Sequence, residues 1–271
     1  MHSWLLHSIK HIEKVYDTGE RPVLAECNDL NFYVCKHNNG RTPATKLFIE
    51  WISHGLLSGV SVKLAKRETV NIKEEHITPS GICQPIYFKN VPLFATLYLE
   101  EALEWSQFNI KDKKLIVNKA DLLKIAFFDI WLGNEDRSFN NFNLLTHPTE
   151  KGFEIIPIDH GACLNSLMFS EEHNLQTLTL NESLINTEEF RILVKPLLKS
   201  MKDADEFVES LYICMPELKK IYDEQVIAMP AEWNIPKRYS DALKENLFHK
   251  EWLSVTKSQF LSFIKSSLKL K

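Results

Sequence analysis

The sequence predicts an α+β protein in two parts, a β-rich part over residues 1–99 and a mostly helical part over residues 100–271. Three observations predict this division. Before residue 100, short apolar segments alternate with turn residues, which is typical of strands. After residue 100, apolar residues recur at helical spacing over long segments. Within the second part, two short apolar segments flank the sequence HPTEKG, which predicts a β-hairpin.

The first part is predicted to contain one helix among its strands. The helix has clear boundaries, because Thr42 is a good N-cap, Pro43 suits the first helical position and Gly59 suits a C-terminal cap. Strands are expected at residues 21–27, 32–36, 60–70 and 91–100.

A lysine and a glutamate of this part are expected to form an ion pair. Lys36 ends a strand and lies on the same strand face as Val34. Glu50 shares a helix face with Leu47, and a carboxylate on a face that packs against the core is costly unless it is paired. Lys36 is the nearest candidate partner. The alternative, two separate surface charges, stays open.

The second part is predicted to be helical on both sides of the hairpin. Residues 119–132 are expected to form a helix, with Asn118 as its N-cap and Gly133 at its end. Apolar residues cover nearly every side of this helix, so we expect it to be buried and to support the loop that follows. A short amphipathic segment is expected at residues 102–110, and further helices at residues 187–201, 203–222 and 240–269, with Thr187, Asp203 and Ser240 as plausible caps.

The loop and hairpin after that first helix are predicted to carry the functional site. The expected strands are residues 141–146 and 153–159, and with Thr146 opposite Phe153 the side chain of Asn141 falls opposite Ile158 or Asp159. Facing residues of a hairpin have Cβ atoms about 5 Å apart. An amide oxygen and a carboxylate would therefore meet at one point, which suits Mg²⁺.

Asp136 lies five residues before Asn141, on the loop that leads into the hairpin, where its carboxylate is placed to face a substrate hydroxyl. The spacing is that of a phosphoryl-transfer site, with a catalytic-loop Asp, a metal-binding Asn five residues later and a second metal-binding Asp on the next strand. Ordinary turns at each of these places are the alternative interpretation, and the agreement of three separations favours the site.

This segment, GNEDRSFNNFNLLTHPTEKGFEIIPIDHG at residues 133–161, resembles the catalytic segment of the HipA-like kinases, especially their short stand-alone branch. It is more distantly similar to the phosphoinositide kinases, which share Asp-Arg, an Asn five residues on and an Ile-Asp-x-Gly. The resemblance extends from about Gly19 to the Pro-Ala-Glu-Trp at residues 230–233 and the helix beyond.

The resemblance implies a bilobal protein-kinase-like fold and transfer of the γ-phosphoryl group of ATP, with Mg²⁺, to a hydroxyl of serine or threonine in a protein. Asp136 would act on that hydroxyl, and Asn141 and Asp159 would hold the metal ion. The residues that the resemblance assigns to the nucleotide are Lys36, Glu50, Gly19 and, as the hinge that binds adenine, Tyr98, Leu99 and Glu100.

Three positions depart from related patterns. Asn134 stands where common protein kinases have a histidine, and His160 follows the metal-binding Asp, in agreement with the nearer family. Ser138 stands where the larger HipA-type toxins carry a histidine, which argues against toxin-like activity but not against phosphoryl transfer. The helix-turn-helix antitoxin with which larger members act is absent from this sequence, so we expect any such regulator to be encoded separately.

Composition argues against several other classes of protein. The net charge of −4 gives no overall basic surface for nucleic acid. No run of about 18 apolar residues occurs, so no membrane span is expected. The five cysteines are odd in number and form no CxxC pair, so neither a disulfide framework nor a zinc site is expected. Reduced thiols favour the cytoplasm.

Two alternatives from other classes of protein remain open. One is a pseudokinase, a nucleotide-binding scaffold without turnover. The other is a metal-dependent hydrolase that uses Asp136, His147, Asp159 and His160. His147 is expected in the hairpin loop, away from the carboxylates, which argues against the hydrolase.

Overall fold

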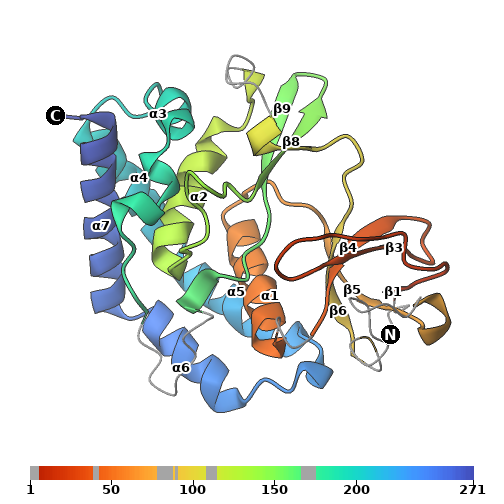
Figure 1. Ribbon diagram of the computed structural model, residues 1–271. Helices are drawn as coiled ribbons and strands as arrows, with labels where there is room; N and C mark the ends of the chain where they lie inside the picture. The colour runs from red at the N-terminus through yellow and green to blue at the C-terminus, as the bar shows by residue number, and fades with distance from the viewer. Residues whose placement is uncertain (1–5, 39–42, 78–87, 89–90, 108–114, 166–174) are drawn as a thin grey trace. The chain divides into compact units, whose positions relative to one another are not determined.

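The computed structural model describes residues 6–38, 43–77, 88, 91–107, 115–165 and 175–271, and the chain divides into two units (Figure 1). The first unit comprises residues 1–51, 65–100 and 228–236, and the second comprises residues 52–64, 101–227 and 237–271. The predicted α+β class is confirmed, with the sheet-rich unit early in the chain and the helical unit later. Two segments differ from the predicted division near residue 99, because residues 52–64 belong to the second unit and residues 228–236 to the first.

A six-stranded sheet of order β1-β5-β6-β4-β3-β2 forms the first unit. Alternate residues of its central strands, among them Val23, Tyr33, Cys35 and Leu93, pack into a buried core on one face. Lys36 follows Cys35 on β4, so its side chain lies on the opposite face. The strands are β1 (Leu6–His7), β2 (Lys14–Val15), β3 (Val23–Glu26), β4 (Phe32–Lys36), β5 (Arg67–Asn71) and β6 (Leu93–Leu97), and a short helix, η1 (Glu74–His76), follows β5.

The strand predicted over residues 60–70 is wrong in its first half. β5 begins at Arg67, and the residues before it lie outside the sheet. The backbone N–H of Lys63 donates instead to Oδ2 of Asp121, at 3.1 Å, within the second unit.

Trp233, in η8 (Ala231–Trp233), is the reason that a late segment belongs to the first unit. Its Nε1 donates to the carbonyl of Pro92 at 2.7 Å, and its ring meets Trp51 edge-on with centroids 5.9 Å apart. The guanidinium of Arg67 also packs over the ring of Trp51, 3.6 Å from the ring centroid. Burial lowers the pKa of Arg67 to about 10.

Helix α1 (Ala44–Gly59) ends where the sequence predicts, but Gly59 does not act as a left-handed cap. The left-handed residue is Ser61, with φ 58°. A Cβ at Gly59 would lie 2.6 Å from Cδ1 of Ile221 and 2.8 Å from Cδ2 of Leu218 in α5 (Met215–Ala228), so a larger residue there would displace these two side-chain ends. The predicted N-cap, Thr42, lies outside the described residues.

Helix α2 (Lys119–Leu132) is the central helix of the second unit, and α3 and α7 pack against it (Figure 1). Its predicted bounds are confirmed, and Gly133 adopts the left-handed φ of 62° that ends it. The indole of Trp131 donates to the carbonyl of Leu247 at 3.0 Å, and Trp252 donates to the carbonyl of Trp131 at 2.9 Å. These bonds join α2 to the C-terminal helices.

Asn118 occupies the predicted N-cap position of α2, but its side chain makes no capping hydrogen bond to the helix backbone. Its amide nitrogen donates to the carbonyl of Ile155 at 2.9 Å, and its amide oxygen accepts from the N–H of Ile155 at 2.8 Å. The same nitrogen donates to Asp121 Oδ2 at 2.9 Å. The side chain therefore joins the start of α2 to the hairpin.

Two of the long helices that the sequence predicts are each divided in two. The segment 203–222 divides at Cys214, because Pro216 lacks an N–H and fits only the first turn of a new helix. The helix before this break is capped by Ser200, whose Oγ accepts from the N–H of Asp203, so Asp203 is not the cap. The segment 240–269 divides before Lys250, where His249 is extended, and Ser240 lies inside a helix.

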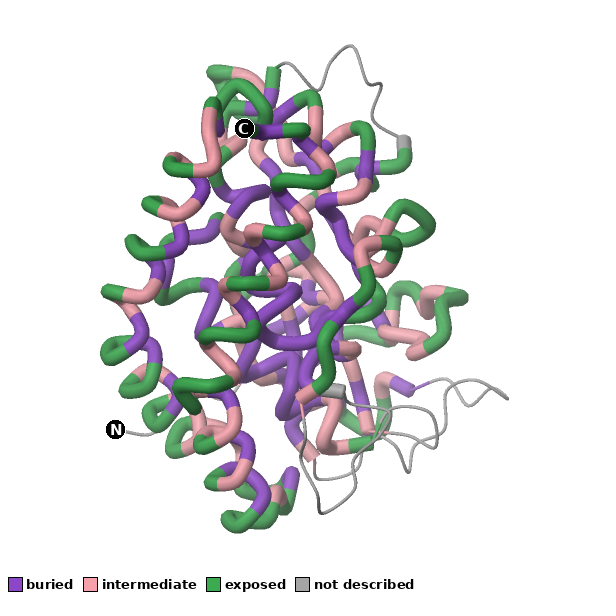
Figure 2. The backbone as a smooth tube through the Cα atoms, turned by 90° about the vertical axis from the view of Figure 1, so that its left-hand side faces the viewer, coloured by how far each residue is buried: buried purple, intermediate pink, exposed green. Residues whose placement is uncertain are grey.

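Buried and exposed residues alternate along the helices (Figure 2), as in α7, where the buried residues are Thr256, Phe260, Ile264 and Leu268. None of the described helices has the length and apolar character that a membrane crossing requires. The remaining helices among the described residues of this unit are α3 (Glu188–Val194), α4 (Met201–Ile213), α6 (Lys237–Leu247) and α7 (Lys250–Leu268), with the short helices η3 (Trp105–Gln107), η5 (Cys163–Asn165), η6 (Leu180–Glu182) and η7 (Leu184–Asn186).

The predicted hairpin is present, but its predicted register is wrong. Strands β8 (Leu144–Thr149) and β9 (Gly152–Pro157) pair so that Thr146 faces Ile155 rather than Phe153. With β7 (Leu103–Glu104) they form a sheet of order β7-β8-β9. The turn has only two residues between Thr149 and Gly152, because Gly152 adopts a φ of 141° that favours glycine.

Gly152→Ala should lower the free energy of unfolding by about 1–3 kcal/mol or more, because it adds backbone strain to a steric clash. A Cβ at this position would lie 2.3 Å from the backbone oxygen of Leu115. Gly19→Ala is the matched control, because a Cβ there would meet nothing within 4 Å. Urea unfolding of both variants checks the prediction, and equal midpoints would contradict it.

Candidate active site

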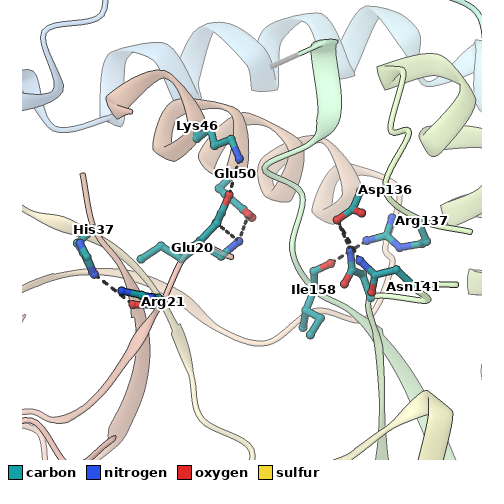
Figure 3. Close-up of polar contacts among 11 residues, drawn as sticks. Glu20, Arg21, His37, Lys46, Glu50, Asp136, Arg137, Asn141 and Ile158 are labelled. Carbon is teal, nitrogen blue, oxygen red and sulfur yellow. Dashed lines mark hydrogen bonds and ion pairs between the residues drawn. The ribbon is translucent and has the colours of Figure 1, made fainter. Parts of the chain in front are cut away.

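Asp136 lies in the loop between α2 and β8, where two amides hold its carboxylate. Its Oδ2 accepts from Nδ2 of Asn141 and from Nδ2 of Asn143, each at 3.1 Å (Figure 3). An ionised carboxylate only accepts hydrogen bonds, so each amide must present its nitrogen and keep its oxygen for other partners. The N–H of Asp136 donates to Oδ1 of Asn134 at 3.2 Å. The residue is exposed, and no described residue hydrogen-bonds to its Oδ1.

The five-residue spacing from Asp136 to Asn141 corresponds to a closed turn. The N–H of Ser138 donates to the carbonyl of Asn141 at 2.9 Å, and the N–H of Asn141 donates to the carbonyl of Ser138 at 3.2 Å. This pair of bonds turns the chain back, which brings the amide of Asn141 to the carboxylate of Asp136.

Arg137, the next residue after Asp136, forms a buried ion pair with Asp129 of α2. Its Nη1 lies 2.5 Å from Oδ1 of Asp129, and the two side chains are 0% and 3% exposed. The same guanidinium donates through Nε to the carbonyl of Phe142 at 3.2 Å. Its Nη2 donates to the carbonyl of Ile158 at 2.8 Å (Figure 3). Phe142 and Ile158 directly adjoin Asn141 and Asp159, so Arg137 holds together the two segments that carry the predicted metal ligands.

Other buried groups complete the surroundings of this ion pair. Asn134 donates from Nδ2 to Asp129 Oδ1 at 2.9 Å and from its backbone N–H to the Asp129 carbonyl at 2.8 Å. Burial raises the pKa of the Asp129 carboxyl, and the Arg137 guanidinium and the Asn134 amide oppose that rise. Sequence reasoning missed this pair, although a carboxylate on a helix that is apolar on nearly every side indicates a buried partner.

Asp159 follows Ile158 with a φ of 55°, in the left-handed region. Asp tolerates this conformation better than most residues, and such backbone strain is concentrated at functional sites. The predicted pairing of Asn141 with Asp159 across the hairpin is wrong, because β8 begins at Leu144 and β9 ends at Pro157. Both residues lie just beyond the strands, and the bonds of Arg137 take the place of strand pairing in fixing their neighbours.

In the first unit, Lys36 forms the expected ion pair with Glu50, which is 1% exposed. Nζ of Lys36 also lies 3.0 Å from Oε2 of a second carboxylate, Glu20. Glu20 in turn accepts at Oε1 from Nζ of Lys46, at 2.9 Å (Figure 3). Sequence reasoning missed Glu20 and Lys46, which no periodic pattern marks.

Gly19 lies next to Glu20 in the loop that joins β2 to β3. It is exposed, and its backbone conformation does not require glycine, since its φ is not in the left-handed region. The contact of Gly19 with the nucleotide phosphates therefore stays a prediction.

Tyr98, Leu99 and Glu100 follow β6 directly. The N–H of Tyr98 donates to the carbonyl of Phe32 at 2.8 Å, at the start of β4. Lys36 pairs with Phe94 at the other end of β4. The predicted adenine hinge and the predicted phosphate-binding lysine therefore lie at opposite ends of one strand pair.

His37, the residue after Lys36, holds the β2–β3 loop through a hydrogen bond to the backbone of Arg21. The ring is 2% exposed, lies 4.7 Å from the Phe88 ring between centroids, and bonds through Nε2 to the carbonyl of Arg21 at 3.1 Å. A carbonyl only accepts, so Nε2 carries the proton. Burial lowers the pKa of His37 below 6.5, against the smaller effects of that carbonyl and of Glu20.

The group of described residues that could hold a metal ion includes neither histidine of the hydrolase alternative. His147 lies within β8, where it faces Glu154, and not in the hairpin loop as predicted. His160 is 3% exposed, and its Nδ1 lies 3.4 Å from Nη2 of Arg137. A ring nitrogen that faces a buried guanidinium is occupied as an acceptor, which disfavours the hydrolase.

Comparisons with known proteins agree with this architecture. A family model described as HipA-like kinase matches residues 9–260. The solved structure of the Helicobacter pylori proinflammatory kinase CtkA is similar over 98% of this chain and 99% of its own, with a TM-score of 0.55 and 13% identity. At this identity the likeness shows the fold, and it confirms the predicted bilobal protein-kinase-like class.

Two further solved kinases are more distant. The Golgi casein kinase is 12% identical with a TM-score of 0.47, over 96% of this chain and 74% of its own. Hydra Fam20 with sugar is 12% identical with a TM-score of 0.48, over 97% of this chain and 88% of its own. No curated protein matches the sequence significantly.

Asp129→Asn should lower the free energy of unfolding by about 3–5 kcal/mol, because it leaves the guanidinium of Arg137 buried without its countercharge. Lys237→Met is the matched control, because it breaks the ion pair of Lys237 with Asp241. The side chains of Lys237 and Asp241 are 85% and 54% exposed. That change should cost less than about 1 kcal/mol. Urea unfolding measures both variants, and equal losses would show that the buried pair has no special weight.

Stability should fall as the pH drops below about 6.5, in part because of His37. Its folded pKa is lowered, so the unfolded chain binds a proton in a range where the folded chain does not. One such group contributes a slope of up to about 1.4 kcal/mol per pH unit. His37→Gln should reduce the slope between pH 7 and pH 5.5, and His249→Gln, at an exposed position, should not. Equal slopes for wild type and His37→Gln would refute this.

Proposed function

Because the chain belongs to the HipA-like kinase family, we propose that it transfers the γ-phosphoryl group of ATP, with Mg²⁺, to a hydroxyl of serine or threonine in a protein. Family membership makes it a kinase, that is, a phosphotransferase. The observation that carries the finer proposal is the carboxylate of Asp136, which two amides hold on an exposed loop that a buried ion pair anchors.

Asp136 orients the attacking hydroxyl and accepts its proton in this proposal. A general base has to be fixed within hydrogen-bond reach of the proton that it takes. What supports the role is that Asn141 and Asn143 bind only Oδ2, so that Oδ1 stays available to a substrate. Hydrogen bonds between Ser138 and Asn141 and from Arg137 hold the surrounding loop in place, which favours catalysis by positioning.

Asn141 and Asp159 are the proposed ligands of Mg²⁺. The donor set fits, because amide and carboxylate oxygens are the hard ligands that this ion prefers. The bond from Asn141 Nδ2 to Asp136 further supports it, since the amide oxygen remains for the metal. When bound, Mg²⁺ neutralises charge on the β- and γ-phosphates.

Lys36 is the proposed partner of the nucleotide phosphates, and Glu50 positions it. The buried ion pair between them supports this assignment, because a lysine held by a helix glutamate is the arrangement that kinases use. The backbone of Tyr98, Leu99 and Glu100 is proposed to bind adenine, and the loop with Gly19 to cover the phosphates.

A protein substrate and a separately encoded regulator are the partners that we propose, and the cytoplasm is the proposed compartment. The thiols support a reducing compartment, since Cys27 and Cys35 are free and buried. Burial raises the pKa of the Cys27 thiol to about 12, which keeps it protonated.

Transfer of radiolabel from ATP to protein in cell extract tests the function. Asp136→Asn should reduce transfer by about 100-fold or more, because the proton acceptor is lost while the shape is kept. Glu135→Gln, a change at the neighbouring exposed carboxylate, should keep activity. Near-normal transfer by Asp136→Asn would reject its role, and a wild-type protein that binds ATP without any transfer would be a pseudokinase.

A further inference from the structure

Glu20 presents a second carboxylate to the lysine that already has Glu50 as its partner. Its Oε2 lies 3.0 Å from Nζ of Lys36, and its Oε1 accepts from Nζ of Lys46 at 2.9 Å. The side chains of Lys36, Glu20 and Lys46 are 11%, 15% and 15% exposed. Glu20 therefore joins two largely buried ammonium groups.

Two ammonium groups, those of Lys36 and Lys46, face two carboxylates, those of Glu20 and Glu50. Glu50 pairs with Lys36 from helix α1, whereas Glu20 comes from the loop between β2 and β3. A carboxylate oxygen offers an ammonium the same partner as a phosphate oxygen, an anionic acceptor. Glu20 thus occupies the place on Lys36 that an anionic ligand requires.

The contact of Glu20 with Lys36 is poorly formed as a hydrogen bond. Oε2 of Glu20 is buried and accepts no hydrogen bond from any residue that the structure describes, although Nζ of Lys36 is near. A buried acceptor without a well-aligned donor is destabilising. A ligand oxygen with better geometry can therefore replace it.

The surroundings of Glu20 are fixed on both sides. The N–H of Tyr16 donates to the carbonyl of Pro22 at 2.9 Å, which closes the base of the loop, and His37 holds the carbonyl of Arg21. Lys46 lies one helical turn before Glu50 on α1. Without Glu20, the ammonium group of Lys46 on α1 and that of Lys36 at the end of β4 would both be available to bind an anion.

We propose that Glu20 competes with the nucleotide phosphates for Lys36 and Lys46, and that Lys46 is a second phosphate-binding residue. This inference rests on the proposed function. Without nucleotide, Glu20 neutralises both lysines and holds the β2–β3 loop against them. The phosphate chain displaces Glu20, after which Lys36 and Lys46 both contact phosphate oxygens.

The alternative to competition with phosphate is that Glu20 only anchors the β2–β3 loop. In that case its loss would loosen the loop and weaken nucleotide binding, and Lys46 would matter only as the anchor of Glu20. The two roles predict opposite changes in affinity, which makes them separable.

Calorimetric titration with ATP, ADP and adenosine tests the proposal. Glu20→Gln should tighten ATP and ADP by about tenfold, equivalent to about 1.4 kcal/mol, and leave adenosine unchanged, since adenosine has no phosphate. Glu26→Gln removes the same charge from the same unit, at the carboxylate that pairs with Lys10, and should change nothing. Unchanged or weaker ATP binding by Glu20→Gln would overturn the competition.

Lys46→Met in the Glu20→Gln background separates the two roles of Lys46. If Lys46 binds phosphate, the added change weakens ATP severalfold and leaves adenosine unchanged. If Lys46 only anchors Glu20, it has no effect in this background, and the assignment falls. Hydrogen exchange without nucleotide gives a second measure, because Glu20→Gln should speed exchange of the amides of residues 16–21, and unchanged exchange would contradict the hold on the loop.

The outcomes also separate this inference from the proposed function. Absence of ATP binding in wild type and all variants would reject both. Wild-type binding and phosphoryl transfer with an unchanged Glu20→Gln variant would reject the competition alone.

Discussion

The buried pair of Arg137 and Asp129 is the interaction on which the candidate site of the second unit depends. Arg137 is 1% exposed as a residue, so its guanidinium has to find partners for its donors inside the protein. Here the partners are a carboxylate of α2 and the carbonyls of Phe142 and Ile158, on three different segments. The position of each segment is thereby tied to the others. Asp136, the residue before Arg137, is placed by the same constraint.

The choice of arginine follows from this geometry. Burial of a charged pair gives little net stability compared with apolar residues of the same volume, so stability does not account for it. Arginine instead offers several donors in a planar fork, which can bind more than one segment at a time. An apolar core would fill the space but would not fix the carbonyls beside Asn141 and Asp159. The pair thus adds little net stability but fixes the positions of the segments that carry Asn141 and Asp159. A site that acts by positioning requires this.

The first unit uses charge in a different way. Lys36 is also largely buried, but its ammonium is a compact group with rotatable donors, and it faces one carboxylate from a helix and one from a loop. Glu50 fixes the position of the lysine, and the contact with Glu20 is poorly aligned. In the second unit the charged pair is a permanent support, whereas in the first unit one of the two contacts is suited to exchange with a ligand.

The sequence by itself determined the features that depend on neighbouring residues. The buried helix α2 and its end at Gly133 follow from periodicity and local backbone preference, and the partner of Glu50 follows from the cost of burying a charge. The order of Asp136, Asn141 and Asp159 was sufficient to suggest the chemistry. The hairpin register depended instead on the tight turn at Gly152, which a sequence pattern of polar turn residues does not distinguish from a longer loop. Only the tertiary structure decided which distant carbonyls and carboxylates the buried donors would reach, because a buried group takes its partners from whatever the fold brings within 3 Å or so, irrespective of their distance along the chain.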